Sequence, residues 1–369
     1  MAKYDRTQPY NDLPLFPPST DLLDKEVLVA LVQAARSLAE LNRNTLRLPN
    51  PGMLINTISL QEAKSSSAIE NIFTTEDELY KAISDTLKEG QANPNTKEVL
   101  RYREALWTGF QNIRSKNAID LNVVISIYRQ IKDSTQGIRP PQSEIVIRRG
   151  DSELRSGEVV YTPPRGKVVL EERMSNLIDY LNETDKDIDP LIKMAIAHYQ
   201  FEAIHPFTDG NGRTGRVLNL LYLVHQGLLS HPVLYLSKYI IEHKDEYYHH
   251  LSAITQRQSW KPWLIYMLKG VEQTSRYTNQ LIDDIVSQME ATLLHGKKEL
   301  KWYSKEINEA LFNQPYIKMS VIGNITKKTS RSTLTKYMTE LCEIGILSPR
   351  QDGKDVFYMN NDLLRILQP

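Results

Sequence analysis

Residues 205–216 read HPFTDGNGRTGR, the densest concentration of functional residue types in the chain. Pro206 disfavours a helical backbone at His205, so the preceding helix is predicted to end there and to leave the imidazole at the rim of a loop. Gly210 and Gly212 can adopt positive φ and carry no Cβ, so backbone N–H groups can close around an anion. The next helix begins at once, and its N-terminus adds unpaired N–H donors. The stretch therefore predicts an anion site between two helices.

The charged side chains of the same stretch indicate which anion binds. Arg213 and Arg216 are three residues apart and share one face of the first helical turn. Two cations there oppose the helix dipole by roughly a few tenths of a kcal/mol each, which a bound anion would offset. Two guanidinium groups suit two phosphates, and the carboxylate of Asp209 is the kind of ligand that holds Mg²⁺ beside them. A glycine-rich turn with solvated arginines explains the glycines but not these side chains together.

These twelve residues resemble the signature of Fic proteins, HPFx(D/E)GN(G/K)RxxR, at every fixed position. The resemblance covers about residues 55–270. It implies a mostly helical domain that transfers AMP from ATP to a hydroxyl side chain (Ser, Thr or Tyr) of a target protein. The neighbouring Doc kinase branch has an altered loop pattern, so the resemblance favours AMP transfer over phosphorylation.

The resemblance also implies a role for each position of the loop. His205 would deprotonate the attacking hydroxyl, Asp209 would hold Mg²⁺ between the α- and β-phosphates, and Phe207 would be a buried anchor. Arg213 would grip the β-phosphate and Arg216 the γ-phosphate, while Asn211 and the backbone of residues 210–212 would bind the α-phosphate. The full predicted set of ATP- and phosphate-binding residues is Asp209, Gly210, Asn211, Gly212, Arg213, Thr214, Gly215 and Arg216.

An inhibitory segment is predicted upstream, on a helix at about residues 59–71 that a capping box at Ser59 and Glu62 would open. Ser66 and Glu70 lie four residues apart and share a face of this helix. Residues 66–71, SSAIEN, resemble the (S/T)xxxE(G/N) inhibitory motif of Fic proteins. The resemblance implies that Glu70 pairs with Arg216 and withholds it from ATP. A solvated surface glutamate is the alternative, and a further role in removing AMP stays open.

Two further regions are expected near the active site. Residues 144–164 alternate apolar and polar side chains around glycines, which predicts a β-hairpin and the one clear β element before residue 340. Fic proteins place a flap here, so Val159, Val160 and Tyr161 are its candidates, with an ordinary surface hairpin as the alternative. Tyr247 and Tyr248 correspond to the adenosine side in relatives, with core packing as the alternative.

The chain is predicted to be mainly α-helical and to divide into three parts. Residues 1–54 form a proline-rich arm and a helix, and residues 55–295 form the Fic domain. Residues 296–369 follow Gly296-Lys297-Lys298 and contain three short predicted helices and a hairpin at Asp352-Gly353, which is typical of a winged helix-turn-helix. Its predicted recognition helix carries Arg331 and Lys336 among many acidic neighbours, so DNA contact and protein contact or dimerisation both remain open.

Composition excludes several classes of protein. The 369 residues contain 45 basic and 45 acidic side chains and a single cysteine, Cys342. Zero net charge excludes a surface that is basic throughout, and one cysteine excludes an intramolecular disulfide framework or a cysteine-based zinc site. The first residues lack the apolar core of a signal peptide, and the chain lacks an apolar run of about 18 residues. We therefore expect a cytoplasmic location and no association with a membrane.

The leading hypothesis is therefore a Mg²⁺-dependent protein adenylyltransferase, inhibited by its own Glu70, whose target is another protein or itself. The rival is a DNA-binding transcriptional regulator whose Fic portion senses nucleotide or is inert. Transfer of a different phosphate-containing group is a third reading. Relatives often dimerise, so a homodimer is one option, while the target and the oligomeric state stay open.

Overall fold

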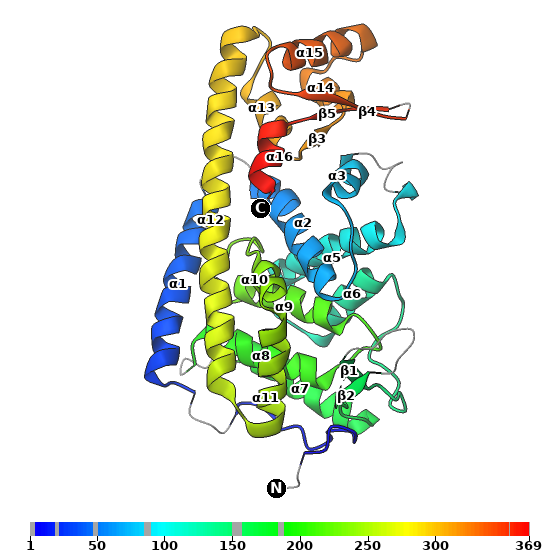
Figure 1. The fold of residues 1–369 in the computed structure, drawn as a ribbon, viewed down its shortest axis with the longest axis vertical. Coiled ribbons are helices and arrows are strands. Elements are labelled where there is room, and N and C mark those ends of the chain that lie inside the picture. Colours follow the sequence, from blue (N-terminus) through cyan, green and yellow to red (C-terminus); the bar gives the residue numbers. More distant parts are fainter. Residues whose placement is uncertain are drawn as a thin grey trace.

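The computed structural model describes residues 4–18, 22–46, 51–84, 90–149, 157–183, 188–353 and 355–368. Helices make up most of it, and two small antiparallel sheets complete it (Figure 1). The prediction of a mainly helical protein is confirmed.

Two buried helices, α8 (Pro190–Ile204) and α9 (Asn211–His225), form the centre of the fold. Nearly every residue of both helices is buried, which places them in the core of the protein. Asp189 caps α8 by accepting a hydrogen bond from the N–H of Leu191, with Pro190 at the first helical position. The loop between these helices is residues 205–210, so the predicted anion site lies on a rigid base.

A ring of amphipathic helices packs around this pair (Figure 1). Helix α5 begins after the capping residue Asn93 and contacts both α6 and α9, while α7 packs on α8. Trp263 of the long helix α12 (Trp260–Glu299) donates its indole N–H to the carbonyl of Ala195 in α8, 2.8 Å away. The ring consists of α5 (Pro94–Lys116), α6 (Leu121–Lys132), α7 (Lys167–Asn182), α10 (Leu236–Glu242) and α11 (Lys244–Arg257).

The helix that precedes Glu70 begins earlier than predicted. Helix α2 spans Pro51–Ile69, so the predicted start at Ser59 is wrong. Proline is favoured at the first helical position, which makes Pro51 a start signal rather than a break. Ser59 and Glu62 do not cap a helix end. Both are buried, and Glu62 accepts hydrogen bonds from Tyr102 and Ser237.

The longest helix, α12 (Trp260–Glu299), runs along one side of the molecule, and α1 (Lys25–Thr45) packs against it (Figure 1). The boundary predicted at residues 296–298 lies within the last turn of α12. The N-terminal arm inserts Leu13 and Phe16 into the core. Asn176 of α7 bonds both the N–H and the carbonyl of Phe16, at 2.8 and 3.0 Å.

The predicted hairpin is present as β1 (Ile147–Arg149) and β2 (Glu158–Tyr161), paired antiparallel with a register shift between Ile147 and Arg148. The tip between the strands lies outside the described residues. The hydroxyl of Tyr161 donates to the carbonyl of Ala203, 2.7 Å away, and the arm packs alongside through a hydrogen bond from Tyr10 N–H to Thr162 O. The base of the hairpin is thereby fixed near the end of α8.

The C-terminal region contains helices and a three-stranded sheet in the order β3-β5-β4. The two-residue strand β3 was not foreseen, so the expectation of one β element before residue 340 is wrong. The terminal helix α16 was not foreseen either, and the winged-helix assignment stays a prediction. The elements are α13 (Lys305–Phe312), β3 (Tyr316–Ile317), α14 (Met319–Thr326), α15 (Arg331–Glu343), β4 (Ser348–Asp352), β5 (Asp355–Met359) and α16 (Asn361–Leu367).

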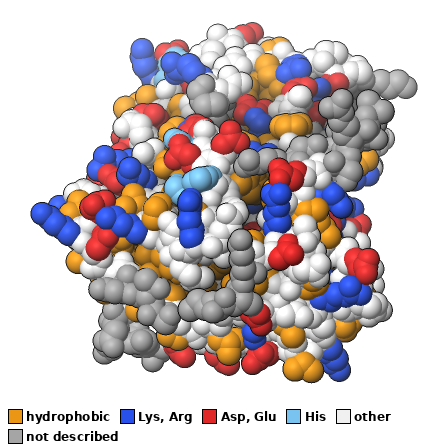
Figure 2. All heavy atoms as spheres, turned by 60° about the horizontal axis from the view of Figure 1, so that its bottom comes forward, with side chains coloured by type: hydrophobic (Ala, Val, Ile, Leu, Met, Phe, Trp, Pro, Cys, Tyr) orange, Lys and Arg blue, Asp and Glu red, His pale blue; other side chains and the backbone are white. Residues whose placement is uncertain are grey.

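This region contacts the short helix α3 (Glu76–Ser84), which follows the Glu70 segment. Asp77 accepts a hydrogen bond from the Tyr316 hydroxyl at 2.6 Å and forms an ion pair with Arg350 at 2.8 Å. Elsewhere the surface is mixed in charge: Figure 2 shows acidic and basic side chains interspersed with apolar ones over one face. Among the described residues, none of the helices is both long and apolar enough to cross a bilayer.

Candidate functional site

The loop begins at His205, where α8 ends as predicted. His205 has a left-handed backbone (φ 51°) and its N–H donates to the carbonyl of Phe201 at 3.0 Å. Arg139, which the sequence analysis did not single out, holds the turn: its Nε donates to His205 O at 2.8 Å and its backbone N–H to Pro206 O at 2.9 Å. The same guanidinium bonds Pro164 O, so one buried arginine joins the loop to the base of the hairpin.

The imidazole of His205 is suited to act as a base at neutral pH. Burial, together with the positive charge of Arg139, lowers its pKa to about 4, although the Glu202 carbonyl and the carboxylates of Glu70 and Asp209 oppose this shift. A lowered pKa means that the neutral form prevails above about pH 4. The ring can therefore accept a proton throughout the physiological range.

Phe207 and Asn211 give the loop its shape. The Phe207 ring is fully buried and stacks on Tyr128 with ring centres 4.0 Å apart, in agreement with the predicted anchor role. The amide of Asn211 accepts from the N–H of Phe207 and donates to its carbonyl, both at 2.9 Å. The Asn211 side chain therefore clamps the backbone of the loop, and its predicted contact with the α-phosphate stays a prediction.

The start of α9 partly matches the predicted nest. Gly210 has positive φ (77°), as expected, but Gly212 is helical. Thr214 is buried and its hydroxyl bonds the Gly210 carbonyl at 2.9 Å. The side of Gly215 faces α8, where an added Cβ would lie 2.7 Å from Glu202 Oε1. Thr214 and Gly215 therefore support the loop and the helix packing instead of facing a phosphate.

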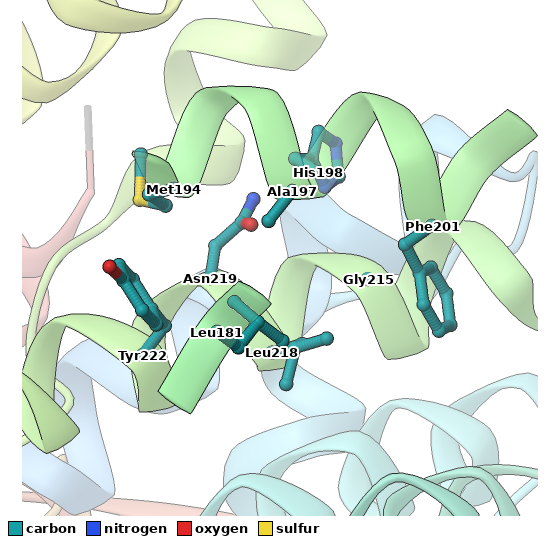
Figure 3. Close-up of a pocket in the computed structure, with 9 residues that line it drawn as sticks. All are labelled: Leu181, Met194, Ala197, His198, Phe201, Gly215, Leu218, Asn219 and Tyr222. Carbon is teal, nitrogen blue, oxygen red and sulfur yellow. The ribbon is translucent and has the colours of Figure 1, made fainter. Parts of the chain in front are cut away.

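Behind the loop, α7, α8 and α9 meet around a narrow gap that has no room for a water molecule (Figure 3). Leu181, His198 and Tyr222 are among its lining residues. Burial lowers the pKa of His198 to about 3, and its Nε2 is bonded to the Tyr247 hydroxyl at 2.8 Å. This gap is core packing and not a ligand site.

Arg216 is buried and bound to the end of α2. Its Nε donates to Ser66 Oγ, and its Nη2 donates to the Ser66 carbonyl and to Glu70 Oε1, each at 2.8 Å. Asn71 follows with positive φ (62°), a conformation that asparagine and glycine adopt most readily, so the chain turns immediately after Glu70. The contact between Glu70 and Arg216 that the sequence analysis expected is present in the structure.

The Glu70 carboxylate also covers the N-terminus of α9. A Cβ at position 212 would collide with Glu70 Oε1 and would lie 3.0 Å from Arg216 Nη1. The missing side chain of Gly212 therefore creates the space that the carboxylate fills. The Glu70 carboxylate therefore takes the place of a bound anion, between the N-terminus of α9 and the guanidinium of Arg216.

Arg213 has a different carboxylate partner, which the sequence analysis missed. Its Nη1 donates to Glu98 Oε1 of α5 at 2.5 Å. Lys132, the last residue of α6, bonds the same oxygen at 3.0 Å and Asp209 Oδ2 at 2.7 Å. Neither Glu98 nor Lys132 lies in a recognisable sequence motif, because they reach the loop only through the packing of α5 and α6.

Asp209 is the candidate metal ligand. Partial burial raises its pKa, but bonds from Lys132 and from the N–H of Gly210 outweigh this effect, so the pKa is lowered and the carboxylate is ionised. Among the described residues there is no group of three or more His, Cys, Asp or Glu side chains that could hold a metal ion. One exposed carboxylate beside the predicted phosphate site fits the chemistry of Mg²⁺, which is usually held by one or two carboxylates and by substrate phosphates.

The two tyrosines expected on the adenosine side differ in their exposure to solvent. Tyr247 is buried, and its ring packs against Trp263, which places it in the core. Tyr248 is 39% exposed and stays a candidate for adenine stacking. Val159, Val160 and Tyr161 lie on β2 and are partly buried, so the flap role stays a prediction.

Glu202 is a buried acidic group that the sequence analysis did not single out. It lies three residues before His205, and burial raises its pKa to about 8. The negative charge of Glu70 also raises this pKa, while the positive charge of Arg216 opposes the rise. The carboxyl is therefore largely neutral at pH 7.

Comparison with known proteins places these features in a family. Residues 28–111 match the N-terminal model of the Fic/DOC family, and residues 118–223 match the Fic/DOC family model. Together these two models span more than half of the chain. Residues 286–363 match the C-terminal domain of SoFic-like protein adenylyltransferases.

Individual relatives are distant. The protein adenylyltransferase fic-1 of Caenorhabditis elegans is 32% identical over 145 residues, which is 38% of this chain and 27% of the relative. The protein adenylyltransferase Fic of Nematostella vectensis is 27% identical over 267 residues, or 70% of this chain and 56% of the relative. The chain thus spans about half or less of these two curated relatives.

Solved structures share the fold. The crystal structure of a Fic family protein from Desulfovibrio desulfuricans superposes with a TM-score of 0.57 at 17% identity, and covers 93% of this chain and 98% of that one. Fic-1 from C. elegans superposes with a TM-score of 0.51 at 23% identity, over 68% of this chain and 72% of that one.

Proposed function

The chain belongs to the Fic/DOC family, and from this premise we propose that it is a protein adenylyltransferase that moves AMP from ATP to a hydroxyl side chain of a protein. The observation that supports this most is the convergence of His205, the N-terminus of α9, Arg213 and Arg216 around one loop. The names of the relatives support the same reaction. A cytoplasmic location and soluble protein targets belong to this proposal.

In the proposed reaction, the target hydroxyl oxygen attacks the α-phosphorus and forms a new O–P bond. The bond from that phosphorus to the bridging oxygen of the β-phosphate breaks, and pyrophosphate leaves with the electron pair. His205 takes the hydroxyl proton on its neutral imidazole, which its lowered pKa keeps available. Arg213 and Arg216 stabilise charge on the β- and γ-phosphates, so the protein contributes chiefly positioning and electrostatics.

Asp209 would hold Mg²⁺ in this reaction, since its ionised carboxylate lies beside the proposed phosphate site. The ion would neutralise phosphate charge when bound. Arg139 contributes by holding the carbonyl of His205, which fixes the direction of the imidazole.

We further propose that Glu70 inhibits the enzyme. Its carboxylate is bound to Arg216 and fills the space over Gly212, so a nucleotide must displace it to reach both groups. If about 1% of molecules have Glu70 displaced, apparent affinity for productive ATP falls about a hundredfold. Ser66 supports this state by bonding Arg216 through its hydroxyl and its carbonyl.

Labelled ATP incubated with the protein and a target lysate tests both proposals. Glu70→Gly is expected to raise labelling, with an AMP mass increment on the modified protein, and His205→Ala is expected to abolish it in either background. Glu40→Gly is the matched control, because it makes the same change at an exposed site on α1. Equal labelling by wild type and Glu70→Gly would refute inhibition, and label that does not depend on His205 would refute the enzyme.

The second candidate is a DNA-binding regulator. Arg331 and Lys336 lie exposed on α15, with Lys327 and Lys328 exposed just before it. A salt-sensitive shift of a specific DNA, without His205-dependent label, would favour this function. His205-dependent label with another mass increment would instead indicate transfer of a different phosphate-containing group.

A further inference from the structure

Arg213 is buried, and its charge needs a partner before any nucleotide binds. The side chain is 2% exposed, and an unpaired guanidinium at such a site is costly. Glu98 supplies the opposite charge through a hydrogen bond to Nη1. Partial burial alone would raise the pKa of Glu98. The charges and hydrogen bonds of Arg213 and Lys132 outweigh burial and lower the pKa below its usual value, so the carboxylate is ionised.

The Nη2 atom of the same guanidinium lies near Gly210, the residue that precedes α9. Arg213 Nη2 lies 3.8 Å from the position that a Cβ on Gly210 would occupy. The stem of Lys132 packs 3.1 Å from the same position, so lysine and arginine flank Gly210 together. Glu98 therefore contacts Arg213 through Nη1, whereas Glu70 contacts Arg216 and lies over Gly212.

Lys132 ties this contact to the other polar group of the loop. It bonds Glu98 at 3.0 Å and Asp209 at 2.7 Å. The charges alternate in the order Arg213, Glu98, Lys132, Asp209, and each is held by its neighbour.

We propose that Glu98 is a positioning residue that presents Arg213 to the β-phosphate of the nucleotide, with Lys132 joining it to Asp209. The inference rests on the proposed function, because it assumes that the loop binds nucleotide phosphates. It assigns Glu98 a role opposite to that of Glu70: one carboxylate supports its arginine for binding, and the other competes with the ligand.

The test compares binding of ADP and AMP to Glu70→Gly by isothermal titration calorimetry without added metal. The ratio of the two dissociation constants isolates the β-phosphate and does not require catalysis. Glu98→Ala is expected to reduce the preference for ADP over AMP about tenfold, because a misdirected guanidinium loses its contact. Glu98→Gln, which keeps an acceptor oxygen, is expected to retain most of the preference.

Two controls separate positioning from a general structural effect. Glu104→Ala removes another carboxylate that joins α5 to α6, through Gln130 at 2.8 Å, and is expected to leave the ratio unchanged. In an Arg213→Ala background, Glu98→Ala is expected to have no further effect, because coupled residues are not additive.

Three results would overturn the inference. An unchanged ratio in Glu98→Ala shows that Arg213 needs no support, and an increased ratio shows that Glu98 competes with phosphate as Glu70 does. If Glu98→Ala does not fold, Lys132→Met supplies the comparison, and a ratio equal to that of the Glu70→Gly parent would contradict the inference. Failure of the Glu70→Gly parent to bind ADP would instead contradict the proposed function, and this inference with it.

Discussion

Two carboxylate–arginine pairs lie side by side at the start of α9, and they differ in what the carboxylate covers. Glu70 directly follows α2, keeps 32% of its side chain exposed and fills the space over Gly212. Glu98 lies near the start of α5, keeps 20% exposed and contacts a second cation, Lys132. We infer that the same type of ion pair can obstruct a site or support it, depending on whether the carboxylate also fills the space over Gly212.

The largest expected effect is an opposite change in activity at the two pairs. Glu70→Gly should raise AMP transfer about a hundredfold, because it frees Arg216 and the space over Gly212. Glu98→Ala in that background should lower transfer at least about tenfold, because Arg213 loses its support. Initial rates with labelled ATP measure both, and changes in the same direction would remove the distinction.

A second prediction concerns the proposed catalytic base, His205, which belongs to neither carboxylate–arginine pair. The pKa of His205 is lowered to about 4, so the neutral, active form persists as the pH falls from 7 to 5. The free-enzyme profile of kcat/KM for Glu70→Gly should have its acidic limb near pH 4. With an ordinary histidine pKa of about 6.5, activity at pH 5 would be about 30-fold lower than at neutral pH. An acidic limb near pH 6.5 would show that His205 is not protected from protonation.

A third prediction weakens the Glu70 pair without touching its atoms. Asn71→Ala places alanine at a φ of 62° and costs about 1 kcal/mol, which should raise activity about fivefold. Asn71→Gly should leave activity low because glycine accepts this φ. Asn117→Ala is the control, since Asn117 ends α5 with a φ of 51°. An equal rise in activity for Asn117→Ala would indicate general loosening instead.

The smallest expected effect is in stability. Glu70→Gln removes one partly exposed ion pair and should cost about 1 kcal/mol, or about 2–4 °C in Tm. Glu98→Gln should lower Tm further, because its carboxylate neutralises both Arg213 and Lys132. Differential scanning calorimetry compares the two with Glu104→Gln. A smaller loss for Glu98→Gln than for Glu70→Gln would contradict the supporting role.

The sequence predicted those parts of the site that depend on neighbours along the chain. Pro206 ended α8, Gly210 took positive φ, and the spacing of Ser66 and Glu70 placed both against Arg216. The predicted start of α2 is wrong because the capping pattern formed by Ser59 and Glu62 occurs inside the helix, where the side chains of these two residues are buried.

The remaining parts depend on tertiary packing and leave no local pattern. Glu98 and Lys132 lie at ends of different helices and meet Arg213 only because α5, α6 and α9 pack together. Arg139 lies in a loop and acts through backbone carbonyls of Pro164 and His205, which no side-chain motif reveals. A strand as short as β3 carries too few residues to show alternation.

The most direct test of the account is a crystal structure of Glu70→Gly soaked with ATP and Mg²⁺. We expect the triphosphate at the N-terminus of α9, with the β-phosphate at Arg213, the γ-phosphate at Arg216, and the His205 imidazole facing the α-phosphorus. Nucleotide bound elsewhere, or an empty loop at saturating ATP, would contradict the claim that Glu70 occupies a phosphate site.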